Sequence, residues 1–203
     1  MGDWCDSSGE FHGVNPFEVI DINNSKTEAW SIDVTDLVNA WIIKQYPNQG
    51  FMLRVVGGGG TFNFHSLESN DPEKSAVLKI LTQIGQEKLV KVSADTYLDN
   101  TTLKGLGGES RLSVSTVKPA LLRFNNEAIG NKTLAKAVLT VYSQKLYGNG
   151  LRIGIFRVCS SKPKSKVEIK RGISAHYPMD IGIENDKNVV FSAGFDDFWW
   201  RGQ

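Results

Sequence analysis

The sequence lacks the residues and runs that mark several large classes of protein. Its 203 residues contain only two cysteines, and no apolar run approaches the roughly 20 residues that a membrane-spanning helix needs. Lys and Arg number 23 against 22 Asp and Glu, and the formal net charge of +1 gives no overall field that would attract nucleic acid or a membrane surface. Residues 1–20 show no basic start followed by an apolar core, so we expect no signal peptide within them.

Catalytic patterns are also scarce. His12, His65 and His176 are scattered and show no metal-ligand spacing. There is no Gly-x-Ser-x-Gly motif and no P-loop, and a strand rather than a helix is expected after the four glycines at residues 57–60. Cys5 and Cys159 could pair or stay free, and the sequence does not decide between these states.

The most informative stretch runs from Trp30 to Glu68. It begins with a short alternating strand and continues with a one-sided apolar stripe, which predicts a helix that Thr35 or Asp36 could cap. Two alternating strands follow on either side of residues 57–60, where glycine permits positive φ. We therefore predict strand, helix and hairpin in this order. The apolar stripe of the helix consists of Val34, Leu37, Val38, Trp41 and Ile42.

Short alternating runs separated by glycine and polar turns make up most of the remaining chain. This pattern predicts an all-β fold, an antiparallel sandwich or jelly roll with one short helix. Residues 83–88 are polar and are interpreted as a connector, and residues 160–170 form a Ser/Pro/Lys-rich linker. The further strands are expected at residues 17–22, 76–81, 90–94, 111–115, 119–124, 134–142 and 151–158.

Arginines inside the apolar strands are the main functional signal. Arg54 and Arg123 alternate with core positions and should project to the solvent face. If they share a face with Asn63, His65 and an aromatic side chain, their guanidinium groups could bind the carboxylates of an acidic sugar chain. The competing interpretation is that they are ordinary solvent-facing arginines that cover apolar neighbours.

A metal site is the other candidate. Asp95, Asp99 and Asn100 fall at an expected strand-to-loop junction, where their oxygens could hold a structural calcium ion. Local Asx turns are the competing interpretation of the same three residues.

Two segments resemble the halves of a known domain. The runs WSIDVTDLVNAW (residues 30–41), GFMLR (50–54) and FNFHSLE (62–68) resemble the second half of DNRLRE-type β-sandwich domains. The runs ADTYL (94–98), RLSV (111–114), ALLRF (120–124) and AVLTVY (137–142) resemble the first half. These domains are similar to the carbohydrate-binding modules of alginate and ulvan lyases. The halves come in swapped order, so the chain is either cut from a tandem array or circularly permuted.

The C-terminal segment carries a second resemblance. The run GISAHYPMDIGIEND at residues 172–186 resembles the opening segment of polysaccharide-lyase-like jelly-roll domains. The catalytic residues of such a domain would lie beyond Gln203, so the resemblance implies that this chain is not an enzyme by itself.

The sequence therefore leads to a specific expectation. Residues 1–158 should form a carbohydrate-binding-module-like sandwich, with the second-half motif in residues 1–82 and the first-half motif in residues 90–158. Residues 159–171 should form a linker, and residues 172–203 the start of a lyase-like domain. The expected ligand is an anionic, uronate-containing polysaccharide such as alginate. Its expected contacts are Arg54 and Arg123 on carboxylates, Asn63, His65 and Arg111 on hydroxyls, and Tyr97 stacked on a sugar ring.

The remaining expectations concern the location of the protein, its partners, its cofactor and the alternative functions. The module would be secreted or displayed on the surface of a bacterium and would target an attached polysaccharide-degrading enzyme. Nucleic acid and membrane are not expected partners, whereas a neighbouring lyase domain or self-association is. Calcium is the one cofactor considered. The alternatives are a structural or adhesive β-sandwich module that binds no saccharide and a fragment of a polysaccharide lyase.

Overall fold

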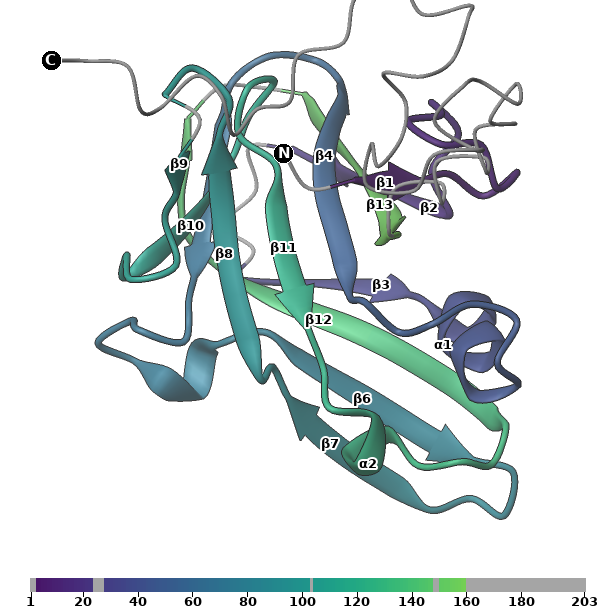
Figure 1. Ribbon diagram of the computed structural model, residues 1–203. Helices are drawn as coiled ribbons and strands as arrows, with labels where there is room; N and C mark the ends of the chain where they lie inside the picture. Colours follow the sequence, from purple (N-terminus) through teal and green to yellow (C-terminus); the bar gives the residue numbers. More distant parts are fainter. Residues whose placement is uncertain (1–2, 24–27, 103, 148–149, 160–203) are drawn as a thin grey trace, which may run out of the picture. The chain divides into compact units, whose positions relative to one another are not determined.

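The computed structural model describes residues 3–23, 28–102, 104–147 and 150–159, in which most of the chain lies in two antiparallel sheets (Figure 1). The first sheet contains, in spatial order, β1 (Trp4–Cys5), β13 (Leu151–Val158), β4 (Phe51–Gly57), β11 (Ala120–Arg123), β8 (Ala94–Asp99) and β9 (Lys104–Gly105), with β2 (Glu18–Ile22) also paired to β13. The second contains β10 (Arg111–Val114), β5 (Thr61–His65), β12 (Leu134–Tyr147), β6 (Val77–Thr82) and β7 (Glu87–Lys91), with β3 (Ala29–Asp33) also paired to β12.

The two sheets pack as a sandwich, which confirms the predicted all-β class. Figure 1 shows β4, β8 and β11 side by side in one layer, while β3, β12, β6 and β7 run across them in the other. Both layers contribute to one hydrophobic core because strands of both sheets turn alternate side chains inward. The largest fully buried side chains include Phe51, Leu53, Phe62, Phe64, Leu112 and Phe124.

The segments that resemble the two halves of one domain share this core. Ala120 of β11 lies opposite Leu53 of β4, and Leu53 and Phe124 belong to the same buried cluster. The pairing of β10 with β5 joins the halves again in the second sheet. Two separate half-sandwiches would each leave a sheet face and strand edges uncovered, so the shared core removes that cost.

The predicted helix is present as α1 (Thr35–Ile42), and it buries Leu37, Val38 and Trp41. The predicted cap is wrong, because Val34 occupies the N-cap position and no side chain caps the helix. Instead, the Asp33 carboxylate accepts hydrogen bonds from the Thr35 backbone N–H at 2.9 Å and from its hydroxyl at 2.6 Å. The remaining short helices are α2 (Asn126–Ile129) and a 3₁₀ turn (Pro72–Lys74).

The hairpin predicted around the four glycines is wrong. β4 pairs with β11 and β13 in the first sheet, whereas β5 pairs with β10 and β12 in the second. Residues 58–60 therefore carry the chain from one layer to the other. Alternating apolar residues identify both strands but do not identify their partners, because either arrangement buries Leu53 and Phe64.

The connector predicted at residues 83–88 is a hairpin turn. The Thr82 N–H donates to the Gln86 carbonyl at 2.9 Å, Gly85 has φ +80, and β7 begins at Glu87 to pair with β6. The strand predicted at residues 90–94 is consequently divided between the end of β7 and the start of β8. Alternating apolar residues did not predict β7, because it is an edge strand in which only Val90 is buried.

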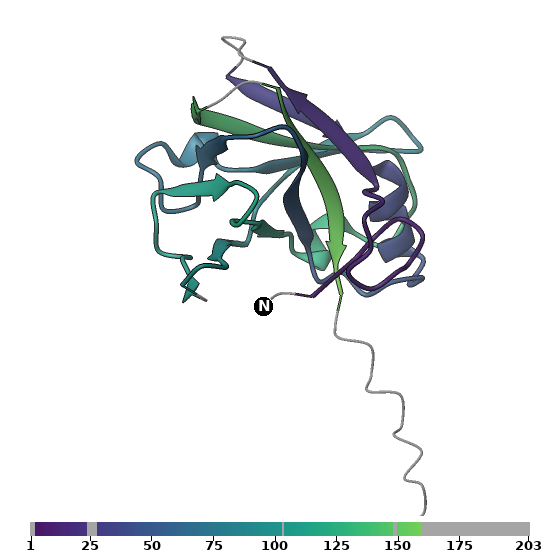
Figure 2. The same ribbon diagram turned by 90° about the horizontal axis from the view of Figure 1, so that it is seen from above.

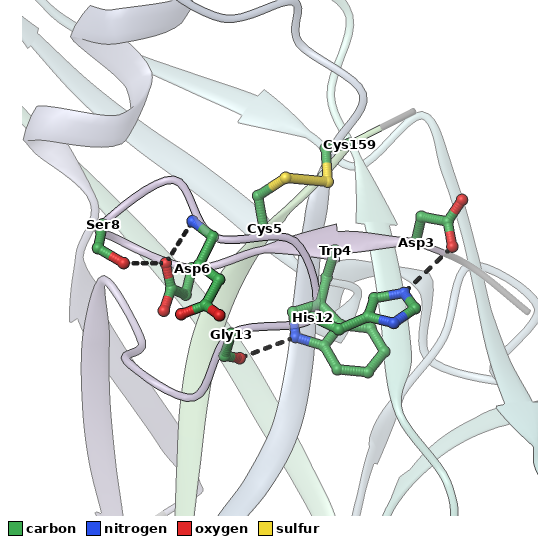
Figure 3. Close-up of a disulfide and its surroundings, with 9 residues drawn as sticks. Asp3, Trp4, Cys5, Asp6, Ser8, His12, Gly13 and Cys159 are labelled. Carbon is green, nitrogen blue, oxygen red and sulfur yellow. Dashed lines mark hydrogen bonds and ion pairs between the residues drawn. A yellow bond between two sulfur atoms is a disulfide. The ribbon is translucent and has the colours of Figure 1, made fainter. Parts of the chain in front are cut away.

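The two ends of the described sandwich are joined covalently. Cys5 in β1 and Cys159, the residue after β13, form a disulfide (Figure 3). Figure 2 shows the N-terminal segment passing close to the end of β13. No helix in the described residues is long and apolar enough to span a membrane. The linker and the lyase-like segment expected at residues 159–203 lie outside the described residues, except for Cys159.

Candidate functional site

The outer face of β5 and β10 brings three of the predicted ligand-binding residues together. His65 lies directly opposite Arg111, and Asn63 lies directly opposite Ser113. Phe62, Phe64, Leu112 and Val114 alternate with them and point into the core. We call the side of these two strands that faces away from the core, with Asn63, His65, Arg111, Ser113 and the adjacent Gln144, the His65–Arg111 face; Asn63 and Ser113 are themselves buried.

Hydrogen bonds hold this face in place. The Ser113 hydroxyl donates to Asn63 Oδ1 at 2.6 Å, and both residues are only 6% exposed. Gln144 Nε2 donates to the Ser110 carbonyl at 3.0 Å and lies 3.4 Å from His65 Nδ1. Asn63 therefore supports the face from below, while His65 and Arg111 are the groups available to a ligand.

Sequence reasoning missed Gln144. β12 changes its register against β5 between Ser143 and Lys145, and this irregularity places Gln144 beside His65. The alternating apolar residues of the run that becomes β12 end before Gln144, so they carry no signal for it. The end of the alternating apolar pattern before Gln144 was the only signal in the sequence, and it does not by itself predict a bulge.

The two basic side chains of the face, His65 and Arg111, differ in their charge at pH 7. Burial, followed by the positive charge of Lys74, lowers the pKa of His65 below 6.5, while Asp71 opposes this shift. His65 is therefore largely neutral at pH 7, with one ring nitrogen to donate and one to accept a hydrogen bond. Arg111 is exposed and has no ion-pair or hydrogen-bond partner among the described residues, so it supplies the permanent positive charge.

Arg54 and Arg123 do not join the His65–Arg111 face, since both lie in the other sheet. The Arg54 guanidinium lies 3.8 Å from the centroid of the Trp4 ring and 5.5 Å from that of Phe156, and it is half-buried. Burial lowers the pKa of Arg54. Arg123 is exposed at the end of β11. The single arginine site expected from the sequence is therefore divided.

Tyr97 was expected to be an exposed platform for a sugar ring, and this prediction is wrong. The side chain is only 5% exposed and belongs to the hydrophobic core. β8 begins at Ala94 and pairs Tyr97 with Ala120 of β11, which places the ring on the inward side of the sheet. A residue in this position packs the sandwich and cannot stack on a ligand.

The structure does not gather the residues of the expected calcium site. Asp95 is the second residue of β8 and Asp99 the last, so about 13 Å of strand separates them at the usual rise per residue. Asp99 accepts hydrogen bonds from the N–H and hydroxyl of Thr101 at 2.9 and 2.5 Å, an Asx turn that also lowers its pKa. Asn100 is exposed beside it. No group of three or more His, Cys, Asp or Glu residues suitable for a metal occurs in the described part of the chain.

Asp95 has a different environment from Asp99. Its Oδ2 accepts a hydrogen bond from the Leu67 N–H at 2.9 Å, whereas its Oδ1 is buried without a partner in the described structure. Burial raises the pKa of Asp95 to about 6. The carboxyl thus ties β8 to the loop after β5, close in sequence to His65.

No protein-family model, curated protein or solved structure matches this chain, so the functional argument depends on the geometry alone.

Proposed function

We propose that this protein is a non-catalytic module that binds an anionic, uronate-containing polysaccharide through the His65–Arg111 face. The observation that carries the proposal is the placement of an unpaired arginine directly opposite a histidine on the outer side of a rigid sheet. A guanidinium group binds a carboxylate through two parallel hydrogen bonds. His65 and Gln144 beside it offer the donors and acceptors that sugar hydroxyls require.

The shape of this face favours a polymer over a small molecule. His65 and Arg111 lie on neighbouring strands of a sheet, so a ligand would be held by shallow contacts along its length. Contacts of this kind are worth about −8 kcal/mol at best, which corresponds to micromolar affinity. Attachment to a polysaccharide-degrading enzyme would then increase the local concentration of that enzyme on its substrate.

The disulfide supports an extracellular location as part of the proposal. Disulfides form and persist in oxidising compartments such as the periplasm and the cell exterior, where a polysaccharide would be encountered.

Calorimetry with alginate and with a neutral glucan tests the proposal. We expect binding to alginate only, and a decrease of about tenfold in affinity on Arg111→Ala, since a charge-assisted hydrogen bond contributes roughly 1.5 kcal/mol or more. Arg152→Ala is the matched control, because Arg152 is an exposed strand arginine already paired with Asp21 at 3.1 Å. Equal affinity for both polymers, or an equal effect of both substitutions, would contradict the proposal. Concentration-dependent oligomers without saccharide binding would support the adhesive alternative instead.

A further inference from the structure

Two cavities away from the His65–Arg111 face meet at a pair of asparagines. One cavity, of about 510 Å³, lies between the end of α1 with the loop that follows it and the α2 region. The second, of about 460 Å³, lies beside the end of β11. Both are lined by Asn48 and Asn126, so they adjoin at these two residues, and each has the size of an ordinary small-ligand site. We call the two adjoining cavities the Asn48–Asn126 groove.

Two hydrogen-bonded amides lie where the two cavities adjoin. Asn48 Nδ2 donates to Asn126 Oδ1 at 2.6 Å and to the Phe124 carbonyl at 3.1 Å. Asn48 Oδ1 accepts from the Gly50 N–H at 3.1 Å, which orients the amide. The amide of Asn126 keeps its own Nδ2 donors, and Asn131 has no partner among the described residues. Because Asn48 holds the Oδ1 of Asn126, the Nδ2 donors of Asn126 are presented to a polar ligand without first having to be ordered.

An unpaired buried donor lies in the wall of the groove. Trp41 lines the larger cavity and is only 7% exposed, and its indole Nε1–H has no hydrogen-bond partner in the described structure. A buried donor without a partner is uncommon in folded proteins because it loses its bonds to water. Tyr46 lines the same cavity, so two aromatic side chains contribute to its wall.

The charges around the groove indicate the class of ligand. Lys44 lines the larger cavity and Arg123 the smaller one, both are exposed, and neither has a salt bridge among the described residues. Glu127 is the one acidic residue that lines either cavity. A cation that lines each cavity, with Asn126 lining both, matches a ligand that carries acid groups on successive units and hydroxyls between them.

We infer that the Asn48–Asn126 groove is a second saccharide site that binds a short stretch of an acidic polysaccharide, with Lys44 and Arg123 contacting carboxylates on either side of Asn126. The inference rests on the proposed function for its ligand class but uses different residues. Two separate sites on one module would bind one polymer with greater avidity than either site alone.

Site-resolved NMR on the full chain tests this inference. The protein, labelled with ¹⁵N, is titrated with a mannuronate tetrasaccharide and separately with cellotetraose, its neutral counterpart. We expect the acidic tetrasaccharide to shift the Trp41 indole signal and the side-chain amide signals of Asn126 and Asn131. These signals report the groove, and the Arg111 signals report the other face in the same titration.

Two substitutions remove charge with little risk to the fold. Lys44 has φ +61, a conformation that glycine adopts without strain, so Lys44→Gly deletes the cation while retaining the chain path. Arg123→Gln replaces an exposed side chain. We expect each to weaken the response of the groove about fivefold to tenfold, as the loss of one charge-assisted contact implies, with Arg152→Gln as the neutral control.

The outcomes separate the two sites. Shifts confined to Arg111 and its neighbours, or equal shifts with cellotetraose, would overturn the groove inference and leave the proposed function standing. Shifts confined to the groove would support the inference and overturn the assignment to the His65–Arg111 face. If neither set of signals moves at millimolar tetrasaccharide, both are wrong.

Discussion

Cys5 and Cys159 are separated by 154 positions in the sequence and are joined by a disulfide across the edge of the first sheet. Cys5 belongs to the edge strand β1, which has only two residues and pairs with the last strand of the described domain. So short a strand contributes few ladder hydrogen bonds, and the covalent bond compensates for this. The residues after β1 depend on the same attachment, because Trp4 and the Asp6 carboxylate organise the loop up to Asn15 (Figure 3).

Removing the disulfide should therefore destabilise the whole sandwich. Chain entropy sets an upper value of about 5 kcal/mol for a loop of this length, and we expect a loss of about 2–5 kcal/mol in the free energy of unfolding when Cys5 and Cys159 are both replaced by Ser. Denaturant unfolding with and without a reductant measures the effect. The double variant should be insensitive to reductant, and an unchanged midpoint of the native protein under reduction would contradict the prediction.

The sequence predicted the elements of this fold more reliably than their partners. Strong alternation, as in the runs around Phe62 and Ile153, identified strands because one face had to be buried. It did not assign β4 and β5 to different sheets, since that choice depends on contacts with strands 46 or more residues away.

For the candidate site too, the sequence predicted strand positions more reliably than it predicted contacts between strands. His65 and Arg111 were recognised as polar residues at strand positions, and their adjacency followed from the register of β5 and β10. Tyr97 was misplaced because a single aromatic residue in a mixed run has no periodic neighbours to fix its face. Gln144 and the Asn48–Asn126 groove depend on a bulge and on loops, for which local patterns carry little information.

The crossing between the two sheets should be sensitive to substitution at Gly58 and tolerant of it at Gly59. Gly58 has φ +74, and a Cβ at this position would collide with the carbonyl oxygen of Gly150. We expect Gly58→Ala to lower the free energy of unfolding by about 1–3 kcal/mol, the usual cost of a strained backbone conformation. Gly59→Ala is the matched control, because a Cβ there meets no atom within 4 Å. Equal unfolding midpoints for the two variants would contradict the assigned conformations.

The two arginines expected to act together should differ in their effect on stability. Arg54 stacks on Trp4, so Arg54→Ala should cost about 1 kcal/mol through the lost cation–π contact and packing. Arg123 is exposed and should change stability by less than about 0.5 kcal/mol when replaced by Ala. Urea unfolding of both variants measures this difference. A destabilisation of the Arg123 variant as large as that of the Arg54 variant would show that the two environments are not distinct.

Asp95 should make the protein less stable as the pH rises through the weakly acidic range. Its pKa in the folded state is about 6, above the value of about 3.9 in an unfolded chain, so between these values the folded state holds more protons. Stability from this group is therefore present below about pH 4 and lost by about pH 6. Asp95→Asn retains an acceptor for Leu67 and should gain about 1 kcal/mol at pH 7, a figure reduced for partial solvent screening.

The control for Asp95 separates charge from hydrogen bonding. Asp95→Ala also removes the charge, but it leaves the Leu67 N–H without the acceptor that now lies at 2.9 Å. It should therefore gain less than the Asn variant. A difference between native protein and Asp95→Asn that is the same at pH 4 and pH 7 would contradict the raised pKa.

His65 should make polysaccharide binding tighter in mild acid. Its pKa is lowered from 6.5, so the ring is mostly neutral at pH 7.5 and becomes charged only below pH 6.5. Uronate carboxylates remain ionised at pH 5.5, since an unperturbed carboxyl group has a pKa of about 4. A second positive charge beside Arg111 should then tighten alginate binding several-fold between pH 7.5 and pH 5.5, as measured by calorimetry at constant ionic strength.

Two variants decide which group causes this pH dependence. His65→Gln retains hydrogen-bonding capacity without titrating, so its affinity should stay constant over this range. Asp95 titrates in the same range, and its carboxyl binds the backbone of Leu67, two residues after His65. The increase should therefore persist in Asp95→Asn. If it disappears in Asp95→Asn and persists in His65→Gln, binding responds to the loop that Asp95 holds and not to the charge of the imidazole.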